Sequence, residues 1–435
     1  MKEIKYVTPE EAVSVIKSGD RVHLSSVAVT PHVLIKPMVE RGRRGEIHDI
    51  KIQHLHIEGP VEFGDTEFEG IFKSEQFFVG PNLRKQTNAG YADYIPVFLS
   101  ETQRLIRLGV LKVNVVLCLC SPPDKHGFVS LGTSVDATLA AIETADTVIA
   151  AVNPNVPRTF GDTIININDI DIFTRDDSEL QPREYSPLTD TEIAIGKNVA
   201  ALVEDGACLQ MGIGGIPNAV MTQLYDHKNL GLHSEMFADG VLPLIDNGVI
   251  NGKNKNIDKG RVVASFLLGS KHLYEYINDN PMILMKEIGY TNDVNIISSL
   301  DKMTAINSAI SVDITGQVCA DSIGTRQFSG VGGQIDFVRG ASMSKGGKAI
   351  IAMASTTKKG ISKITSVLSL GSGVCTTRSN MHYLVTEYGA VDLFGKTLQD
   401  RAKAIISIAH PSHREELDRA AFERFGPHFH YISSK

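Results

Sequence analysis

The chain has few cysteines and no long apolar segment. Its 435 residues include five cysteines and no Cys-x-x-Cys pair, which excludes a disulfide scaffold, and we expect reduced thiols in a cytoplasmic protein. No run of about 18 apolar residues occurs, and residues 1–13 lack the apolar stretch of a signal peptide, so neither a membrane span nor export is expected. The net charge of −7 argues against nucleic acid or an anionic membrane as a partner.

The chain has the composition of an ordinary globular protein. Its length is too great for a single hydrophobic core. Hydrophobic residues make up 42% and charged residues 21% of the sequence, and 435 residues predict two domains. Near the start, Thr8 caps a predicted helix, residues 21–26 predict a strand, and Pro31 lies at the start of a second helix.

The same order of elements returns in the second half. Asp190 is expected to cap a helix, residues 207–212 predict a strand, and Pro217 opens the next helix. The later segments also pair across the halves, 121–130 with 311–320 and 147–153 with 349–355. A duplication explains this, although the general likeness of strand–helix units is an alternative. We predict an α/β protein of two similar open α/β domains with largely parallel sheets, residues 1–185 and 186–435.

Glycine-rich loops follow two of the predicted strands. Ligands of open parallel sheets bind beyond the carboxyl ends of strands, which makes residues 25–32 and 212–218 candidates. Gly212, Gly214 and Gly215 let the second loop turn sharply and present N–H groups to an anion or a carbonyl oxygen, although such glycines also close turns that bind nothing. The segment lacks the GxGxxG pattern and the lysine of a phosphate-binding loop, so a nucleotide site is not expected.

Two further glycine clusters lie in the second half. In residues 329–341, three closely spaced glycines are followed by an acid and a base. Residues 344–350 place Lys345 and Lys348 around a glycine pair. These lysines suit a phosphate or pyrophosphate, and a solvated turn is the alternative.

Acids and histidines near predicted strand ends are the candidates for chemistry. Glu235 follows the apolar run 229–232 and is expected to face the 212–218 loop, where a carboxylate beside N–H donors can attack an acyl carbon. Most acids in such places are structural, which is the competing interpretation. His54, His56 and Glu58 resemble metal ligands, but they alternate along a predicted strand without a further ligand cluster, so we interpret them as structural.

Several segments, taken in order, are similar to one known family. Leu232-His233-Ser234-Glu235 resembles the catalytic-glutamate signature of class I coenzyme A transferases, and nearly the whole chain resembles their acetyl-CoA hydrolase/transferase branch. The segments that carry the resemblance are 121–136, 152–162, 212–220, 330–341 and 388–417. The chain departs from the family pattern after Glu235, where it has Met236 and Phe237 in place of the Asn-Gly of many relatives.

The resemblance implies a transferase that moves coenzyme A between a short-chain acyl-CoA and a carboxylic acid such as 4-hydroxybutyrate, butyrate or acetate. Glu235 is implied as the nucleophile of a ping-pong reaction through a glutamyl-CoA thioester, with coenzyme A as substrate and with neither a metal nor a permanently bound cofactor. The implied substrate and coenzyme A contacts are His32, Gln210, Met211, Gly212, Ile213, Gly214, Gly215, Asn307, Ser329, Gly330, Gly332, Gly333 and Lys345.

Other functions stay open. They are an acyl-CoA hydrolase that uses Glu235 with water as the acceptor, a noncatalytic coenzyme A- or acid-binding module, and a sugar-phosphate isomerase on a similar fold. A homodimer or higher homo-oligomer is expected. Because no arginine occurs in loops 25–32 and 210–218, we expect short aliphatic acids to be preferred over succinate.

Overall fold

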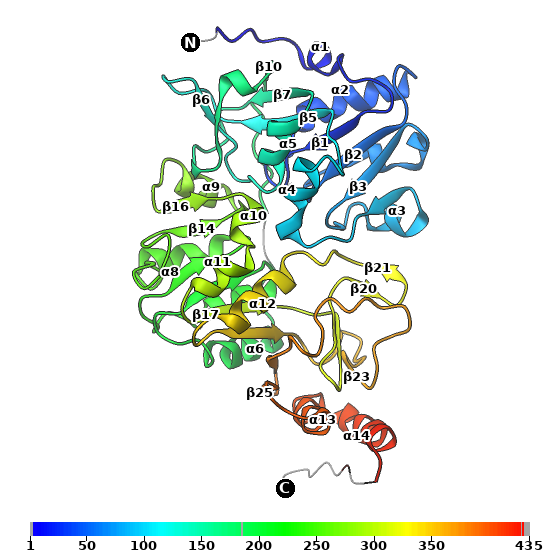
Figure 1. Cartoon of the computed structure of the whole chain (residues 1–435), viewed down its shortest axis with the longest axis vertical. Coiled ribbons are helices and arrows are strands. Elements are labelled where there is room, and N and C mark those ends of the chain that lie inside the picture. Colours follow the sequence, from blue (N-terminus) through cyan, green and yellow to red (C-terminus); the bar gives the residue numbers. More distant parts are fainter. Residues whose placement is uncertain (1–2, 184–185, 428, 430–435) are drawn as a thin grey trace.

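The computed structural model describes residues 3–183, 186–427 and 429, and two sheets dominate this part of the chain. The first sheet has seven strands in the order β10-β7-β5-β1-β2-β3-β4, all paired in parallel (Figure 1). Its strands are β1 (Arg21–Leu24), β2 (Ile50–His54), β3 (Phe72–Gln76), β4 (Ala92–Tyr94), β5 (Val115–Cys120), β7 (Thr147–Val152) and β10 (Ile172–Arg175).

The second sheet has nine strands among the described residues, in the order β25-β24-β22-β17-β11-β12-β14-β16-β8. Every pairing is parallel except the one between β24 and β25. Its strands are β8 (Phe160–Gly161), β11 (Cys208–Met211), β12 (Gly231–His233), β14 (Val262–Ala264), β16 (Ile283–Met285), β17 (Met303–Asn307), β22 (Lys348–Ala352), β24 (Tyr383–Thr386) and β25 (Gly389–Asp392).

The two sheets share one topology. The strands β24-β22-β17-β11-β12-β14-β16 follow the same sequence of chain crossings as β10-β7-β5-β1-β2-β3-β4, with β11 in the place of β1. This confirms the prediction of two similar, largely parallel α/β halves. The second sheet is wider because β25 extends one edge and β8, a short strand from the first half, pairs with β16 at the other.

Helix starts follow local capping chemistry. Thr8 caps α1 (Pro9–Val13) through a capping box with Glu11, as expected. The prediction that Asp190 is a cap is wrong by one residue, because Thr189 caps α6 (Asp190–Ala200) through the same arrangement with Glu192. The helix expected to open at Pro217, α7 (Gly215–Met221), begins at Gly215. Pro31 caps α2 (His32–Arg43) without a side-chain hydrogen bond.

The halves meet through helices and loops on the carboxyl side of their strands (Figure 1). In this contact Arg107 pairs with Glu287 at 2.9 Å, and Lys286 pairs with Asp162 at 2.7 Å. One apolar core also runs from the first half into the second. The helices that matter for the site are α3 (Arg84–Ala89), α4 (Leu99–Arg107), α10 (Ile288–Thr291), α11 (Val294–Ser299) and α12 (Gln334–Met343).

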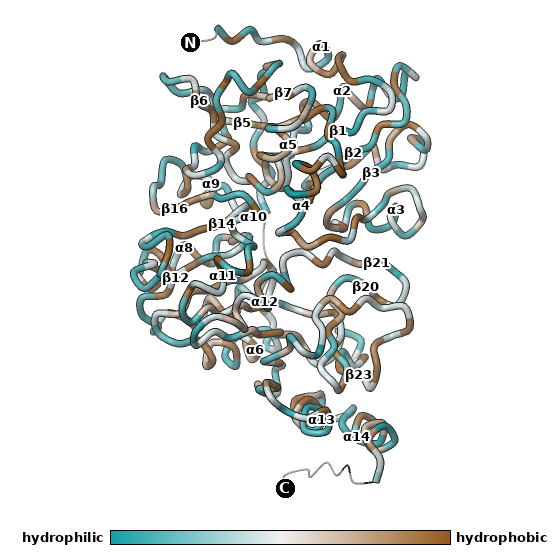
Figure 2. Tube along the Cα trace, in the orientation of Figure 1, coloured by the Kyte–Doolittle hydropathy of each residue, from teal (hydrophilic) through white to brown (hydrophobic). Residues whose placement is uncertain are grey.

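The remaining elements surround the sheets, and the hydrophilic residues of α3 lie at the surface (Figure 2). They are β6 (Phe128–Ser130), α5 (Thr138–Thr144), β9 (Ile164–Asn166), β13 (Met236–Phe237), α8 (Leu242–Asp246), β15 (Phe266–Leu267), α9 (Lys271–Ile277), β18 (Ser311–Asp313), β19 (Val318–Cys319), β20 (Ser322–Ile323), β21 (Arg326–Gln327), β23 (Ile364–Thr365), α13 (Leu398–Ser407) and α14 (Pro411–Phe425). None of the described helices has the length and apolar character that crossing a membrane requires.

Candidate active site

Glu235 lies in the bend between β12 and β13, at the carboxyl end of the second sheet. Its carbonyl oxygen accepts hydrogen bonds from the N–H groups of Ser265 and Phe266, at 2.9 and 3.1 Å. The preceding residue, Ser234, donates its hydroxyl to the carbonyl oxygen of Met211 at 3.0 Å. The backbone of Glu235 is therefore fixed between the end of β11 and the start of β15.

Two donors hold the Glu235 carboxylate. The side-chain amide of Asn292 donates to Glu235 Oε2 at 3.2 Å, and the backbone N–H of Gly333 also donates to this carboxylate. A Cβ atom at position 333 would lie 2.1 Å from Glu235 Oε2 and 2.2 Å from Asn292 Nδ2. Only glycine therefore allows the backbone to approach the carboxylate this closely.

The same Asn292 amide joins a second carboxylate. Its Nδ2 lies 3.3 Å from Asp336 Oδ2, in the first turns of α12. Asp336 in turn accepts the hydroxyl of Ser100 at 2.9 Å and the N–H of Ser100 at 3.2 Å. Ser100 lies on α4, so a chain of hydrogen bonds runs from the first half of the molecule to Glu235.

Burial dominates the electrostatics of these acids. Removal from water raises the pKa of Glu235 from 4.5 to about 7; the Asn292 and Gly333 hydrogen bonds oppose this and the Asp336 charge adds to it. Burial likewise raises the pKa of Asp336 to about 6, against the hydrogen bonds from Ser100 and Asn292. Glu235 thus exchanges its proton near neutral pH, where an acid–base or nucleophilic group is most useful.

The loop after β11 has a mixed role. A Cβ atom on Gly212 or Gly214 would meet nothing within 4 Å, and Gly214 has a φ of +121° that side chains rarely adopt. Gly215 instead packs against α6, because a Cβ atom there would lie 1.8 Å from Glu192 Oε1. Ile213 lies partly buried against the main core, and Met211 is buried. The first two glycines leave open space, whereas Gly215 serves helix packing.

Gln210 and Asn307 form a pair across β11 and β17. Asn307 Nδ2 donates to Gln210 Oε1 at 3.0 Å, and Gln210 Nε2 donates back at 3.4 Å. Both residues lie near the carboxyl ends of their strands, but neither amide contacts the Glu235 carboxylate among the described residues. Each amide retains further hydrogen-bonding capacity.

The loop before α12 runs along the first half of the molecule. Gly332 accepts the N–H of Leu99 at 3.3 Å, and the N–H of Val331 donates to Tyr94 at 3.0 Å. Gly330 lies against the Phe78 ring. Ser329 is held by its N–H to the carbonyl oxygen of Asp321 at 2.8 Å. The structure thus brings this loop, through Gly333, to Glu235.

Two predicted contacts lie elsewhere. Lys345 follows the far end of α12, where its carbonyl oxygen accepts the N–H of Lys302 just before β17. This is the amino edge of the sheet, opposite the edge that carries Glu235. Lys348, at the start of β22, pairs with Glu204. His32 bonds through Nε2 to the Glu58 carbonyl oxygen at 2.7 Å and lines a cavity of about 260 Å³ under loop 25–32.

The prediction that His54, His56 and Glu58 share one strand is wrong for the last two, because β2 ends at His54 and His56 and Glu58 lie in the loop that follows it. His56 Nε2 lies 2.8 Å from Glu58 Oε1, and Arg183 lies 3.1 Å from the same carboxylate. No group of three or more metal-type side chains gathers anywhere in the described residues. Arg183 matters for the expected acid preference, because it brings a guanidinium beside loop 25–32 from a distant part of the chain. The premise that no arginine is available on the acyl side therefore holds only for the two loops themselves.

Asn292, Asp336 and Ser100 were not among the residues predicted for the site. Asp336 had a signal, since it follows the glycine cluster at 329–333. Asn292 and Ser100 had none, because each is one polar residue at a helix end and only the packing of α10 and α4 brings them to Glu235.

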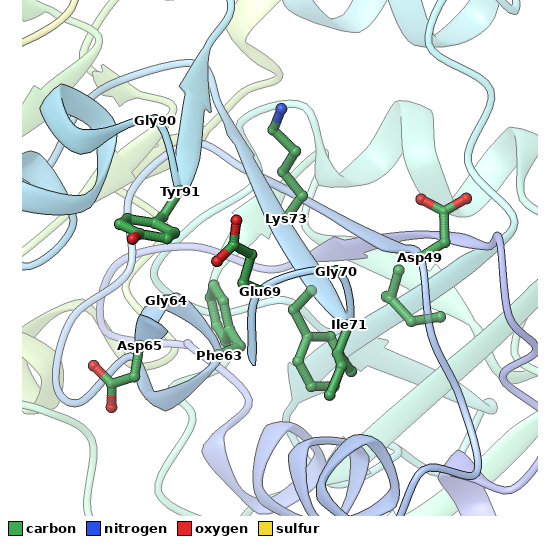
Figure 3. Close-up of a pocket in the computed structure, with 12 residues that line it drawn as sticks. Asp49, Phe63, Gly64, Asp65, Glu69, Gly70, Ile71, Lys73, Gly90 and Tyr91 are labelled. Carbon is green, nitrogen blue, oxygen red and sulfur yellow. The ribbon is translucent and has the colours of Figure 1, made fainter. Parts of the chain in front are cut away.

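Another hollow, of about 210 Å³, lies at the opposite edge of the first sheet (Figure 3). It is lined by the residues that precede and begin β2 and β3, among them Asp49 and Lys73, and by Glu69 and Tyr91. Parallel strands present their loops for ligands at the carboxyl ends, so this amino-edge hollow is not part of the site around Glu235.

Residues 2–182 match the N-terminal domain of the acetyl-CoA hydrolase/transferase family, and residues 269–421 match its C-terminal domain. The chain belongs to this family. It is therefore an enzyme, and the resemblance of the chain to the acetyl-CoA hydrolase/transferase branch is confirmed.

Relatives of this family member match it almost from end to end. It is 46% identical to a succinyl-CoA:acetate/propanoyl-CoA:succinate CoA transferase of Fasciola hepatica, over 95% of this chain and 87% of that protein. It is 45% identical to a 4-hydroxybutyrate coenzyme A transferase of Clostridium kluyveri, over 97% and 98% of the two chains. The crystal structure of RipA from Yersinia pestis superposes with a TM-score of 0.92 at 35% identity, over 97% and 98%.

Proposed function

We propose that this enzyme transfers coenzyme A between a short-chain acyl-CoA and a carboxylic acid such as 4-hydroxybutyrate, butyrate or acetate, with Glu235 as the nucleophile. The observation that carries the proposal is the Glu235 carboxylate, which lies half-buried at the carboxyl edge of the second sheet between the Gly333 N–H and the Asn292 amide. Relatives at 46% and 45% identity are named as coenzyme A transferases, which supports the same reaction class.

In the first half-reaction, the deprotonated Glu235 attacks the thioester carbon of the acyl-CoA. The carbonyl π electrons move to oxygen. When they return, the C–S bond breaks, coenzyme A departs as its thiolate, and an acyl-glutamyl anhydride remains on the enzyme. The thiolate then attacks the glutamyl carbon and releases the first acid as a carboxylate, which leaves a glutamyl-CoA thioester. A second carboxylate repeats these steps in reverse. No net oxidation or proton transfer is required.

The donors around Glu235 fit the charges that this reaction develops. When Glu235 becomes an anhydride or thioester, the Gly333 N–H and the Asn292 amide are placed to stabilise negative charge on its carbonyl oxygen. One donor of this kind contributes ~10²–10³ in rate. Asp336 accepts the other contact of the Asn292 amide and, with Thr291 Oγ1 donating to Asn292 Oδ1 at 2.9 Å, fixes its orientation.

Transfer and hydrolysis differ in whether water reaches the glutamyl thioester. Met236 and Phe237 are buried directly after Glu235, in the small sheet that β13 forms with β15. Apolar walls at this point favour a carboxylate acceptor over bulk water. Hydrolysis through the same Glu235 is the alternative function, and it predicts equal loss of acyl-CoA with and without an added acid.

The decisive experiment is to trap the intermediate. Incubation with acyl-CoA and no acceptor should add the mass of coenzyme A, less one water, to the peptide that contains Glu235. Borohydride should reduce that thioester and abolish further turnover. Glu235→Gln is the control, and a thioester on another residue would contradict the proposal. A noncatalytic binding module or an isomerase would form no adduct.

The remaining expectations are part of the same proposal. We place the domain boundary between residues 185 and 186, because the strands of the first sheet end at Arg175 and those of the second, apart from β8, start at Cys208; residues 184–185 lie outside the described residues. Coenzyme A is a substrate, with no permanently bound cofactor. All five cysteines are free and buried, which supports a reducing compartment such as the cytoplasm.

We also propose a homodimer or higher oligomer. Its support is a set of large apolar side chains left exposed on this single chain, of which Leu370 is 97% and Phe394 is 69% exposed. Light scattering on the purified enzyme tests this directly, and a monomer at assay concentration would contradict it.

A further inference from the structure

A hollow of about 670 Å³ lies where α3 of the first half faces the β20–β21 hairpin of the second. Three cations line it, Arg84 and Lys85 from α3 and Arg326 from β21, and no carboxylate does. Asn88 joins the two walls, since it donates to the Gln327 carbonyl oxygen at 2.8 Å and accepts the Gln327 N–H at 2.9 Å. The hollow is thus a fixed feature of the contact between the halves.

The three cations have no acidic partner. Across the described residues, none of them lies within ion-pair distance of an Asp or Glu. Arg84 is nevertheless held in place, with Nε donating to the Phe328 carbonyl oxygen at 2.6 Å and its guanidinium 3.8 Å from the centre of the Phe328 ring. Its two terminal nitrogens remain for an anion, and a fixed guanidinium fork matches the oxygens of a phosphate.

The hollow also lies within reach of Glu235 along one short loop. Phe328, which anchors Arg84, is five residues before Gly333, which contacts Glu235. Five residues span at most about 18 Å. The pantetheine arm of coenzyme A, from sulfur to the first phosphorus, is on the order of 15 Å when extended, by the same bond dimensions. The arm is therefore long enough for a thioester at Glu235 to reach this hollow with its phosphates.

The lysines that the sequence favoured for a phosphate do not meet these conditions. Lys345 lies at the amino edge of the second sheet, and Lys348 is already paired with Glu204. Resting on the proposed transferase function, we propose that Arg84, Lys85 and Arg326 bind the phosphate groups of coenzyme A. Because this hollow is built by both halves, phosphate binding there also holds the halves together around Glu235.

The test compares acetyl-CoA with S-acetylpantetheine, which carries the same thioester and arm but no phosphate. Lys85→Gln and Arg326→Gln remove one charge each without disturbing Arg84, and Lys73→Gln, in the distant hollow of Figure 3, is the charge-matched control. We expect each of the first two variants to raise the KM for acetyl-CoA about tenfold, in line with a charged hydrogen bond, and to leave kcat unchanged. With S-acetylpantetheine, both should match the wild type.

Several results would overturn the site. One is an unchanged KM for acetyl-CoA in Lys85→Gln and Arg326→Gln, and another is an equal rise in their KM for S-acetylpantetheine. The same rise of KM in Lys73→Gln would also overturn it, as would a rise of KM in Lys345→Gln with none in the two variants. The glutamyl-CoA adduct is measured on the same variants at saturating acetyl-CoA. If the adduct forms while the KM does not change, the phosphate site fails and the transferase proposal stands; if no adduct forms in the wild type, the transferase proposal itself fails.

Discussion

Asn292 Nδ2 lies 3.2 Å from Glu235 Oε2, and the same amide lies 3.3 Å from the carboxylate of Asp336. One neutral side chain therefore separates the half-buried Glu235 and the buried Asp336, whose pKa values are raised to about 7 and about 6. The amide favours the charged form of each acid, while burial and their mutual repulsion oppose it. This balance sets the fraction of Glu235 that is ready to react at neutral pH.

Shortening Glu235 should abolish most transfer. Glu235→Asp keeps the charge but withdraws the carboxylate by about 1.5 Å, and an error of about 1 Å can cost ~10²-fold. Glu235→Gln keeps the shape and loses the nucleophile, so its activity should fall further. Single-turnover transfer from acetyl-CoA to butyrate measures both variants. Wild-type activity in a folded Glu235→Gln protein would remove Glu235 from the mechanism.

Glu235→Gln should also make the enzyme more stable at alkaline pH. In the folded state Glu235 holds its proton with a pKa of about 7, against an ordinary value of 4.5, so the fold loses stability as pH rises through this window and bears the full penalty above it. The shift corresponds to at most about 3 kcal/mol. We expect the gain in free energy of unfolding to be largest at pH 8 and to shrink toward pH 5. Denaturant titrations at both pH values would show it, and an equal gain at both would contradict this origin.

Gly333→Ala should be far more damaging than its size suggests. The added methyl would meet Glu235 Oε2 at 2.1 Å, with Asn292 Nδ2 equally close, so the carboxylate must move from its donors. Activity should fall by ~10² or more, by the loss of near-attack placement. Gly240→Ala is the matched control, because its nearest contact would be 3.4 Å, from Asn218. Comparable losses of activity in the two variants would contradict this explanation, because Gly240→Ala places no methyl group against Glu235.

Much of the fold follows from local patterns, as these elements show. The capping box at Thr8 and the short strands after it return around Thr189, and the matched strand orders confirm that likeness. Pairing across the chain is not local, so β8 could not be assigned to the second sheet from a two-residue segment. Glu235 carried a motif, whereas Asn292 and Ser100 reach the site only through packing of α10 and α4.

Gly215 illustrates how one motif can conceal two roles. From the sequence, the backbone N–H of Gly215 is expected to face coenzyme A, and Gly215→Val is expected to weaken activity more than stability. The structure adds Glu192, whose Oε1 would lie 1.8 Å from a Cβ atom there. Glu192 closes the capping box of α6, so the substitution should also lower the melting temperature. Thermal unfolding beside kcat/KM separates the two, and a large loss of stability with normal specific activity would favour the packing role alone.

The pH dependence of transfer offers a test with two opposite signs. Because only deprotonated Glu235 attacks, kcat/KM should rise with pH through an apparent pKa of about 7. Asn292→Ala removes a donor to the carboxylate, so the rise should move to higher pH and the activity lost at pH 7 should partly return at pH 9. Asp336→Asn removes the neighbouring charge that raises the pKa of Glu235, so the rise should move to lower pH. Glu101, whose charge raises the pKa of Asp336, is unchanged in this variant. Profiles from pH 5.5 to 9 on both variants decide the matter. Shifts in the same direction, or an unmoved profile in both, would mean that a group other than Glu235 governs the rise.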